Sequence, residues 1–347
     1  MASGPSTDRP EPDVRAAALA AAARTRAQGM HYYGHVLGVT PLRTDAGPSR
    51  PHLAVSSAVT PGPVPPIALA TVADLAMGSA IRSVVGAGRR LGTVSMTLHH
   101  LAPVVCAPVV PDPRVVWLDD EQVNGLARVD LTDAAGALVG AAQGWFMALP
   151  APSGTPLPLL PWERDELPAV APLAEHDLTA AERAAVEATV RAAERARRHR
   201  TSASAELTAP TWTDAAEGSA RGTLRIGPEI TNRVGHVQGG AVYGIALAAA
   251  TRAVGAGLAV AEGHVQFLRP ADGDVLTAVA STTRLGRGAA FAEATLTVDD
   301  RPVAAGRFAF RPPRPAAPLQ GPAASLRGAG GRGVLFQDGG AGAPSAA

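Results

Sequence analysis

The sequence contains two blocks that repeat one pattern, and this internal duplication is the strongest constraint on the fold. Residues 62–64 (Gly-Pro-Val) align with residues 235–237 (Gly-His-Val), at an offset of 235 − 62 = 173 residues. The prolines that close a later strand, Pro103 and Pro270, are 270 − 103 = 167 residues apart. The six-residue difference between these offsets places a length change in the loop between the two anchors. Two anchors joined by an ungapped apolar helix indicate two copies of one structural unit.

Each block predicts the same order of elements: an alanine-rich helix, a polar strand, a long apolar helix, a strand that ends in proline, and a final run of strands. The first block places them at 13–28, 52–60, 67–85, 93–103 and 127–149. The second block places them at 178–200, 219–227, 241–254, 263–273 and 292–312. Thr179 and Glu182 form a capping box at the start of the second alanine-rich helix. This order predicts an α+β fold with a mostly antiparallel sheet.

A proline-rich segment separates the two blocks. Its spaced prolines exclude a continuous helix or a central strand over residues 151–175, which we expect to form a linker. The linker divides the chain into predicted domains at 13–150 and 176–312. Residues 1–12 and 313–347 are rich in Pro, Ser, Gly and Ala, and we expect disordered tails there because such segments bury little apolar surface.

The charge and cysteine content exclude several classes of protein. The 31 basic and 30 acidic residues give a net charge of +1, which argues against a nucleic-acid binder with a broad basic surface. A single cysteine excludes a disulfide framework and any multi-cysteine metal site. We found no apolar run that approaches the roughly 18–20 residues of a membrane span and no secretion signal at the start. We therefore expect a cytoplasmic protein without a membrane span.

The segment from Asn232 to Val242, Asn-Arg-Val-Gly-His-Val-Gln-Gly-Gly-Ala-Val, precedes an apolar helix and then Gln266-Phe-Leu-Arg-Pro270. This pattern resembles the PaaI-type hotdog thioesterases, in which an Asn and a His-Gly-Gly step open a long central helix. The resemblance implies two tandem hotdog domains, each a long helix wrapped by antiparallel sheet, that pair as an intramolecular pseudo-dimer. It also implies hydrolysis of acyl-coenzyme A thioesters and a homodimer of such chains. No metal or redox cofactor is suggested, since coenzyme A is part of the substrate.

The resemblance divides the family's site residues between the two copies. In the family, each site takes an Asn and a Gly from one unit and an acidic residue and a hydroxyl from the other. The second copy retains Asn232, Gly239 and Gly240, whereas the first copy retains Asp74 at the acid position and Thr93 at the hydroxyl position. The opposite combination is lost, because the remaining positions are occupied by Val59, Pro65, Pro66, Leu247 and Val260. One composite site is therefore expected.

Thioester hydrolysis gives each of these residues a chemical role. The N–H of Gly239 at a helix N-terminus would stabilise the developing oxyanion, and Asn232 would add a side-chain donor or hold the water. Asp74 would act as a general base or as a nucleophile, and the sequence leaves this choice open. Thr93 would hydrogen-bond Asp74 or the attacking water.

Four further residues are predicted to contact the substrate. Gln238 stands where the family has histidine, and it can donate a hydrogen bond but cannot titrate near neutral pH. His236 lies two residues earlier, and Gly240 follows Gly239 in the helix. Arg287 is a candidate for the coenzyme A phosphates, because guanidinium groups suit phosphate.

Two other functions remain open at this stage. A non-catalytic acyl-CoA-binding protein would use the same cavity without hydrolysis. A hotdog dehydratase or hydratase would need a His–Asp pair, which His236 and Asp74 could supply. The identity and length of the acyl group are not encoded in any pattern that the sequence shows.

Overall fold

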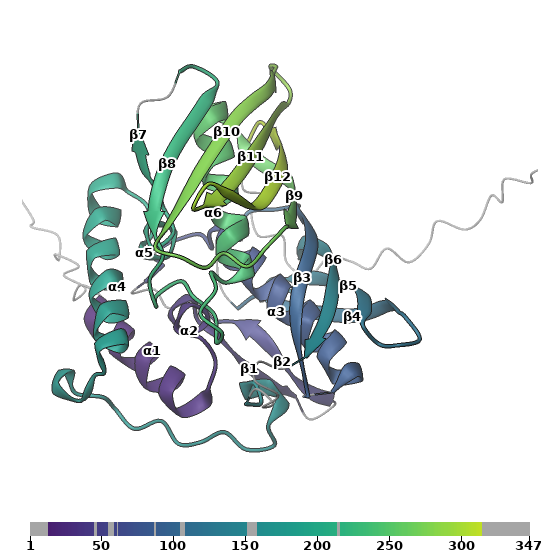
Figure 1. Cartoon of the computed structure of the whole chain (residues 1–347), viewed down its shortest axis with the longest axis vertical. Helices are drawn as coiled ribbons and strands as arrows, with labels where there is room; N and C mark the ends of the chain where they lie inside the picture. Colours follow the sequence, from purple (N-terminus) through teal and green to yellow (C-terminus); the bar gives the residue numbers. More distant parts are fainter. Residues whose placement is uncertain are drawn as a thin grey trace, which may run out of the picture. The chain divides into compact units, whose positions relative to one another are not determined.

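The computed structural model describes residues 13–44, 47–54, 59–60, 62–86, 88–104, 108–150, 158–213 and 216–313. These residues lie in one compact unit within Met1–Ala316. The predicted tails at 1–12 and beyond 313, and residues 151–157 of the predicted linker, lie outside the described residues. The structure is α+β, with the two hotdog units expected from the resemblance (Figure 1).

The described residues of the first unit form three α-helices and six strands. Its helices are α1 (Val14–Gln28), α2 (Tyr32–Leu37) and the central helix α3 (Pro66–Val85). A separate hairpin is formed by β1 (Val39–Thr44) and β2 (Gly47–Leu53). The strands that wrap α3 are β3 (Arg89–His100), β4 (Val110–Leu118), β5 (Asn124–Thr132) and β6 (Leu138–Pro150).

The second unit repeats this order. Its helices are α4 (Ala180–His199), α5 (Ala203–Glu206) and the central helix α6 (Gly239–Val254). The first two strands are β7 (Thr211–Thr213) and β8 (Ser219–Arg225). The strands that follow α6 are β9 (Ala259–Phe267), β10 (Val275–Leu285), β11 (Ala290–Val298) and β12 (Arg301–Arg311). The capping box predicted at Thr179 and Glu182 is present at the start of α4.

The two units share one antiparallel sheet, with strand order β4-β5-β6-β3-β9-β12-β11-β10-β8-β7. The units meet where β3 pairs with β9, and Thr97 lies opposite His264 in that pairing. These two residues are 264 − 97 = 167 apart, the offset between the closing prolines. Equivalent residues of the two copies therefore face each other at the centre of the sheet. Thr97 Oγ1 and His264 Nδ1 are hydrogen-bonded there at 2.9 Å. A pseudo-two-fold axis through this pair relates the units.

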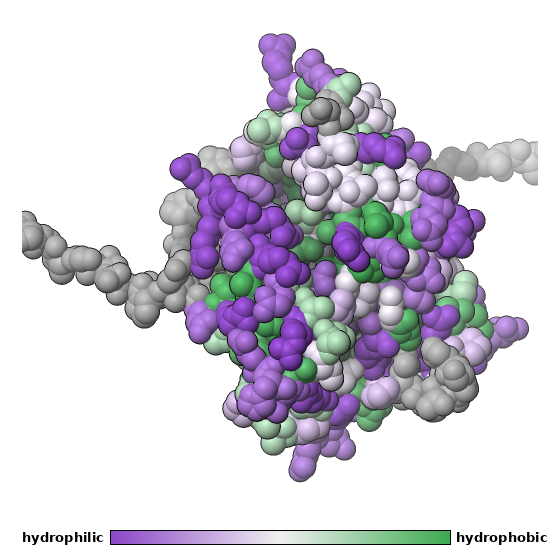
Figure 2. Space-filling model, turned by 60° about the vertical axis from the view of Figure 1, so that its left-hand side comes forward, coloured by the Kyte–Doolittle hydropathy of each residue, from purple (hydrophilic) through white to green (hydrophobic). Residues whose placement is uncertain are grey.

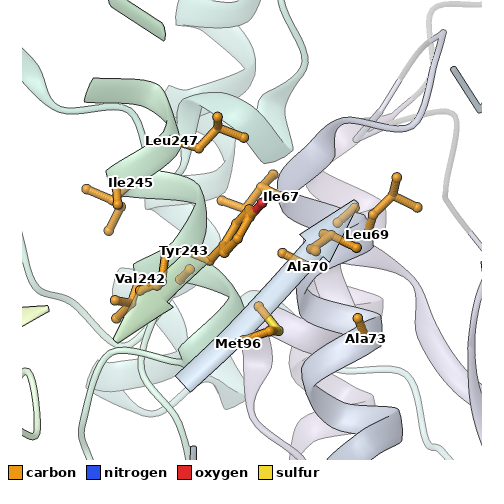
Figure 3. Packing of buried hydrophobic residues seen from close by; sticks show 14 of the residues in the cluster. Ile67, Leu69, Ala70, Ala73, Met96, Val242, Tyr243, Ile245 and Leu247 are labelled. Carbon is orange, nitrogen blue, oxygen red and sulfur yellow. The ribbon is translucent and has the colours of Figure 1, made fainter. Parts of the chain in front are cut away.

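The two central helices cross at two small residues of α6. A Cβ on Gly240 would overlap Thr71 of α3, and a Cβ on Gly244 would overlap Ile67 of α3. The offset of 173 residues makes Ile67 equivalent to Gly240 and Thr71 equivalent to Gly244, so the crossing follows the same pseudo-symmetry. Figure 3 shows Ile67 and Tyr243 between the helices, with Met96 of β3 in the same cluster. The glycines let the helix backbones approach closely.

The helices α1 and α4 pack against each other in a cluster separate from the main hydrophobic core. The helices α1 and α4, which are equivalent in the duplication, bury alanines such as Ala21 and Ala192 in a separate hydrophobic cluster. Arg15 of α1 forms ion pairs with Glu187 of α4 and with Glu175, which precedes α4. The surface seen in Figure 2 is mainly hydrophilic, with a hydrophobic area near its middle.

The two units differ in how their first hairpin is attached. In the second unit, β7 and β8 extend the main sheet beside β10. In the first unit, β1 and β2 form their own sheet, and one isolated bridge between Leu53 and Val109 connects them to the position where β4 begins. The space beside β2 is occupied in part by a 3-10 turn at Pro161–Glu163.

The described part of the predicted linker packs against the first unit. Trp162 is 4% exposed, and Glu163 pairs with Arg82 of α3, with Arg82 Nε 2.7 Å from Glu163 Oε1. The helix α3 itself is long and apolar enough to cross a bilayer, contrary to the expectation from the sequence, but 67% of its apolar window is buried inside the protein. Its apolar character thus reflects its central position in the core.

Replacing Gly240 with alanine should destabilise the protein by about 3 kcal/mol, because the added methyl group overlaps the α3 backbone at Thr71. Gly78 provides the matched control inside α3, since a Cβ there lies 3.6 Å from Phe146. Gly78→Ala should stabilise the helix by about 0.5–1 kcal/mol. Urea unfolding measures both changes, and equal stability of the two variants would contradict the close crossing.

Candidate functional site

A cavity of about 550 Å³ lies between the two units. The first unit contributes side chains from α3, β3 and β6 to its wall. The second unit contributes the loop 232–238, the start of α6 and the end of β9. Asp74, Thr93, Asn232, His236, Gln238 and Gly239 all line this one cavity. The structure thus brings together residues that are up to 165 positions apart in the sequence.

The carboxylate of Asp74 lies at the junction of the two units. Its residue is 8% exposed and stands in the middle of α3 among apolar neighbours. Thr93 of β3 donates a hydrogen bond from Oγ1 to Oδ1 of Asp74 at 2.7 Å. Gln238 of the second unit donates from Nε2 to Oδ2 at 2.9 Å. Each carboxylate oxygen is therefore held by a donor from a different element.

Burial and hydrogen bonding act on Asp74 in opposite directions. Burial raises the pKa of Asp74 to about 6, because desolvation penalises the charged form. The hydrogen bonds from Thr93 and Gln238 lower the pKa of Asp74 and oppose part of this effect. The group is consequently ionised at neutral pH, yet it is a stronger base than an exposed aspartate. A carboxylate with these properties can accept a proton from water or attack an electrophile.

The N-terminus of α6 faces this carboxylate. Gln238 caps the helix, with its Oε1 accepting from the N–H of Ala241 at 3.1 Å. A Cβ built on Gly239 would lie 2.7 Å from Oδ2 of Asp74, so glycine is the residue that fits beside the carboxylate. The first N–H groups of a helix have no intrahelical acceptor and carry the positive end of the helix dipole. The site therefore combines a carboxylate with backbone donors.

A tight turn at Asn232 positions the residues that precede α6. Oδ1 of Asn232 accepts from the N–H of Val234 at 3.0 Å and from the N–H of His236 at 3.1 Å. Gly235 adopts φ +83°, a conformation that suits glycine. The side-chain oxygen of Asn232 is thus committed to the turn, and its amide nitrogen is the atom left for a ligand. We predicted a donor to the substrate, and the contacts seen are those of a turn residue.

The other predicted substrate contacts are only partly brought to the cavity. His236 lines the cavity. The hydrogen bonds to Asp74 come from Thr93 and Gln238 rather than from His236. Gly240 is buried against Thr71 in the helix crossing and does not line the cavity. Arg287 is exposed in the turn between β10 and β11, away from the cavity wall. Gly240 and Arg287 therefore lie outside the cavity wall, and their contact with substrate stays a prediction.

The position that the pseudo-two-fold axis relates to the Asp74–Gly239 site lacks the chemical groups of that site. Leu247, the equivalent of Asp74, is 6% exposed and apolar. Pro66 begins α3 where Gly239 begins α6, and proline has no N–H to offer an oxyanion. Val260 replaces the hydroxyl of Thr93. One composite arrangement is present among the described residues.

His31, Arg82 and Arg233 also line the cavity and were not anticipated from the sequence. Arg82 had a usable signal, since Asp74 and Arg82 are the two charged residues of α3 and stand about two turns apart. His31 caps the short helix α2, and nothing in its local sequence distinguishes it from a structural cap.

Comparison with known proteins gives a family match for the second unit. Residues 228–311 match the family model described as the acyl-CoA thioesterase N-terminal domain. This segment supplies Asn232, Gln238 and Gly239, whereas Asp74 lies outside it. No curated protein matches the sequence.

Solved structures with a similar fold come from several bacteria. A putative thioesterase II from Thermobifida fusca is 14% identical, with a TM-score of 0.49 over 82% of this chain and 98% of its own. The tesB protein of Mycobacterium avium subspecies paratuberculosis is 14% identical, with a TM-score of 0.48 over 81% and 99%. A Bacillus halodurans protein solved with CoA is 23% identical, with a TM-score of 0.37 over 40% and 97%.

Asp74→Asn should stabilise the protein above about pH 7 and have little effect near pH 4. The raised pKa of Asp74 means that the folded state favours the neutral acid. The contribution of neutral Asp74 to the free energy of unfolding is complete below the pKa of the unfolded state. It is lost as the pH rises through about 6. The stability difference should reach about 3 kcal/mol at high pH. Urea unfolding of both proteins across this range measures it, and a difference independent of pH would contradict the assignment.

Thr93→Val should raise the pKa of Asp74 further, moving its titration midpoint toward neutral pH. The hydroxyl of Thr93 donates to the carboxylate and so stabilises its charged form. Thr97→Val is the matched control, because Thr97 lies in the same strand but bonds His264. Carbon-13 NMR titration of the aspartate carboxyl measures the midpoint. An unchanged midpoint in Thr93→Val, or an equal shift in both variants, would contradict the arrangement.

Proposed function

We propose that this cavity hydrolyses acyl-CoA thioesters to the free acid and coenzyme A, as in the PaaI-type family that the sequence resembles. The observation that carries the proposal is the placement of the Asp74 carboxylate beside Gly239, at the N-terminus of α6, within one cavity. The family match of residues 228–311 supports the same reaction class. A carboxylate and helix-end donors are the two groups that acyl transfer to water requires.

The oxyanion forms at the helix end in this scheme. The thioester carbonyl oxygen points to the N–H of Gly239, where the helix dipole favours developing negative charge. Such a donor is worth about 3 kcal/mol or more of the activation barrier. Glycine at this position keeps the backbone accessible, since a side chain would collide with Asp74.

Asp74 supplies the other half of the reaction. As a general base it removes a proton from the water that attacks the carbonyl carbon. As a nucleophile it forms an acyl anhydride with Oδ1 or Oδ2 and releases the thiolate of coenzyme A, after which water cleaves the anhydride. Thr93 and Gln238 orient the carboxylate in either case. Label found in Asp74 after a single turnover in oxygen-18 water would identify the nucleophile route, because water must then have attacked the aspartyl carbon of an anhydride.

Asp74→Ala and Asp74→Asn should each lower kcat for thiol release from acyl-CoA by about a thousandfold. The loss follows because both variants lack a group that can accept a proton or attack. Asp130→Asn is the matched control, since Asp130 is a carboxylate of β5 paired with Arg128 outside the cavity. A panel of acyl-CoAs with a thiol-reactive dye measures the rates.

The same panel tests the two other functions. Unchanged turnover in both Asp74 variants, with folding intact, would remove Asp74 from the reaction. Tight acyl-CoA binding without thiol release from the wild type would favour a binding protein. Loss of enoyl-CoA absorbance without thiol release would favour a hydratase, which would have to use His236 with Asp74. The value of kcat/KM for thioester hydrolysis should rise as the pH increases through the pKa of Asp74, near 6.

A further inference from the structure

Guanidinium groups dominate the charge of the cavity. Arg82, Arg90, Arg233 and Arg269 line it, whereas Asp74 is the single carboxylate among the described lining residues. The chain as a whole has a net charge of only +1. This concentration of positive charge exceeds what the reaction at Asp74 requires, and it indicates an anionic ligand.

Two elements lead from the reacting carboxylate to the same group of arginines. Along α3, Arg82 lies eight residues after Asp74, which corresponds to about 12 Å. Along β3, Arg90 lies three residues before Thr93, the partner of Asp74. Nη1 of Arg82 donates to the backbone oxygen of Arg89 at 3.0 Å, so the two elements meet there. Arg82 and Arg90 therefore lie about 10–12 Å along their elements from Asp74 and Thr93, which is about the length of a short acyl chain.

Among the described groups that act on Arg233, cationic side chains outnumber carboxylates. Glu163 is already paired with Arg82, and Arg164 lies close enough to repel Arg233 as well. Burial, together with Arg82 and Arg164, lowers the pKa of Arg233 to about 10, and Glu163 opposes this only in part. Arg233 donates to the backbone oxygen of Pro158, which fixes the guanidinium group without neutralising it. An anion at this place would relieve the repulsion.

His31 adds a neutral donor beside Arg233. Its Nδ1 accepts from the N–H of Gly34 at 2.9 Å, so the proton resides on Nε2. Burial and Arg233 lower the pKa of His31 to about 3, which keeps the ring neutral. His31 lines the cavity and is 7% exposed, and Nε2 has no hydrogen-bond partner among the residues that the structure describes. Buried donors of this kind are normally satisfied.

We propose that His31, Arg82, Arg90 and Arg233 form an anion-binding subsite for a second acidic group at the far end of the acyl chain. The preferred substrates would then be thioesters of dicarboxylic acids. This inference rests on the proposed function, because it assigns one end of the same substrate. Carboxylate and phosphate oxygens share the required chemistry. The burial of Arg82 and His31 favours the acyl carboxylate, whereas the exposed Arg269 suits the phosphates of coenzyme A.

The test compares acyl groups that differ only in the terminal carboxylate. The pairs are hexanoyl and adipyl thioesters and octanoyl and suberyl thioesters, each carried on coenzyme A and on N-acetylcysteamine, which has no phosphate. In the wild type, kcat/KM should favour the dicarboxylic member of at least one pair by about tenfold or more on both carriers. Arg233→Gln should reduce this ratio to near one, and Arg233→Lys should retain part of it. Arg269→Gln and Arg287→Gln should leave the ratio unchanged.

Three results would overturn the assignment to the acyl group. Equal rates for both members of every pair in the wild type would do so, as would an unaltered ratio in Arg233→Gln. A loss in Arg233→Gln that is equal for both acyl groups but confined to the coenzyme A carrier would assign the anion to a phosphate. If no thioester is cleaved, the proposed function fails, but the subsite can still be tested by calorimetry with Asp74→Asn. Tighter binding of adipyl-CoA than of hexanoyl-CoA would support the subsite, and equal binding would overturn it.

Discussion

The close crossing of α3 and α6 is the contact on which the rest of the structure depends. Gly240 and Gly244 allow the two helix backbones to approach, and the approach brings the middle of α3 over the N-terminus of α6. The same pseudo-symmetry aligns β3 with β9, with Thr97 opposite His264. Helix crossing and strand pairing thus specify one relative placement of the two units. The position of Asp74 beside Gly239 is a consequence of that placement.

The site carries an energetic cost that the surrounding structure offsets. Burying the Asp74 carboxylate disfavours its charged form, and two hydrogen bonds from different units recover part of the loss. Buried ionised groups that persist despite such a penalty are typical of functional sites rather than of stabilising contacts. The excess of guanidinium groups in the same cavity is a second strained feature of this kind. Both features would be eased by a substrate that is polar at its reacting carbonyl and anionic elsewhere.

Much of the architecture could be predicted from the sequence because duplication and periodicity are local signals. The offsets between equivalent glycines and prolines gave the repeat, and the capping box at Thr179 marked a helix start that the structure contains. The pairing of Asp74 with Gly239 and Thr93 in one cavity was also anticipated, through motif positions. The separate β1–β2 hairpin was not, because its detachment from β4 depends on packing by residues 161–163. His31 and Arg233 were not predicted for a related reason, because their role depends on the residues that surround them in the folded structure.

Covalent fusion removes a restriction that applies to assemblies of identical subunits. In a symmetric pair of identical subunits, any substitution near one site also appears near the other. Each subunit must therefore keep both the helix terminus and the acid. Here Pro66 and Leu247 stand where a second centre would have been. The half that holds the helix terminus and the half that holds the acid can therefore diverge independently. Under the proposed function, one consequence is a single active site per polypeptide, and the related position at Pro66 and Leu247 serves packing instead.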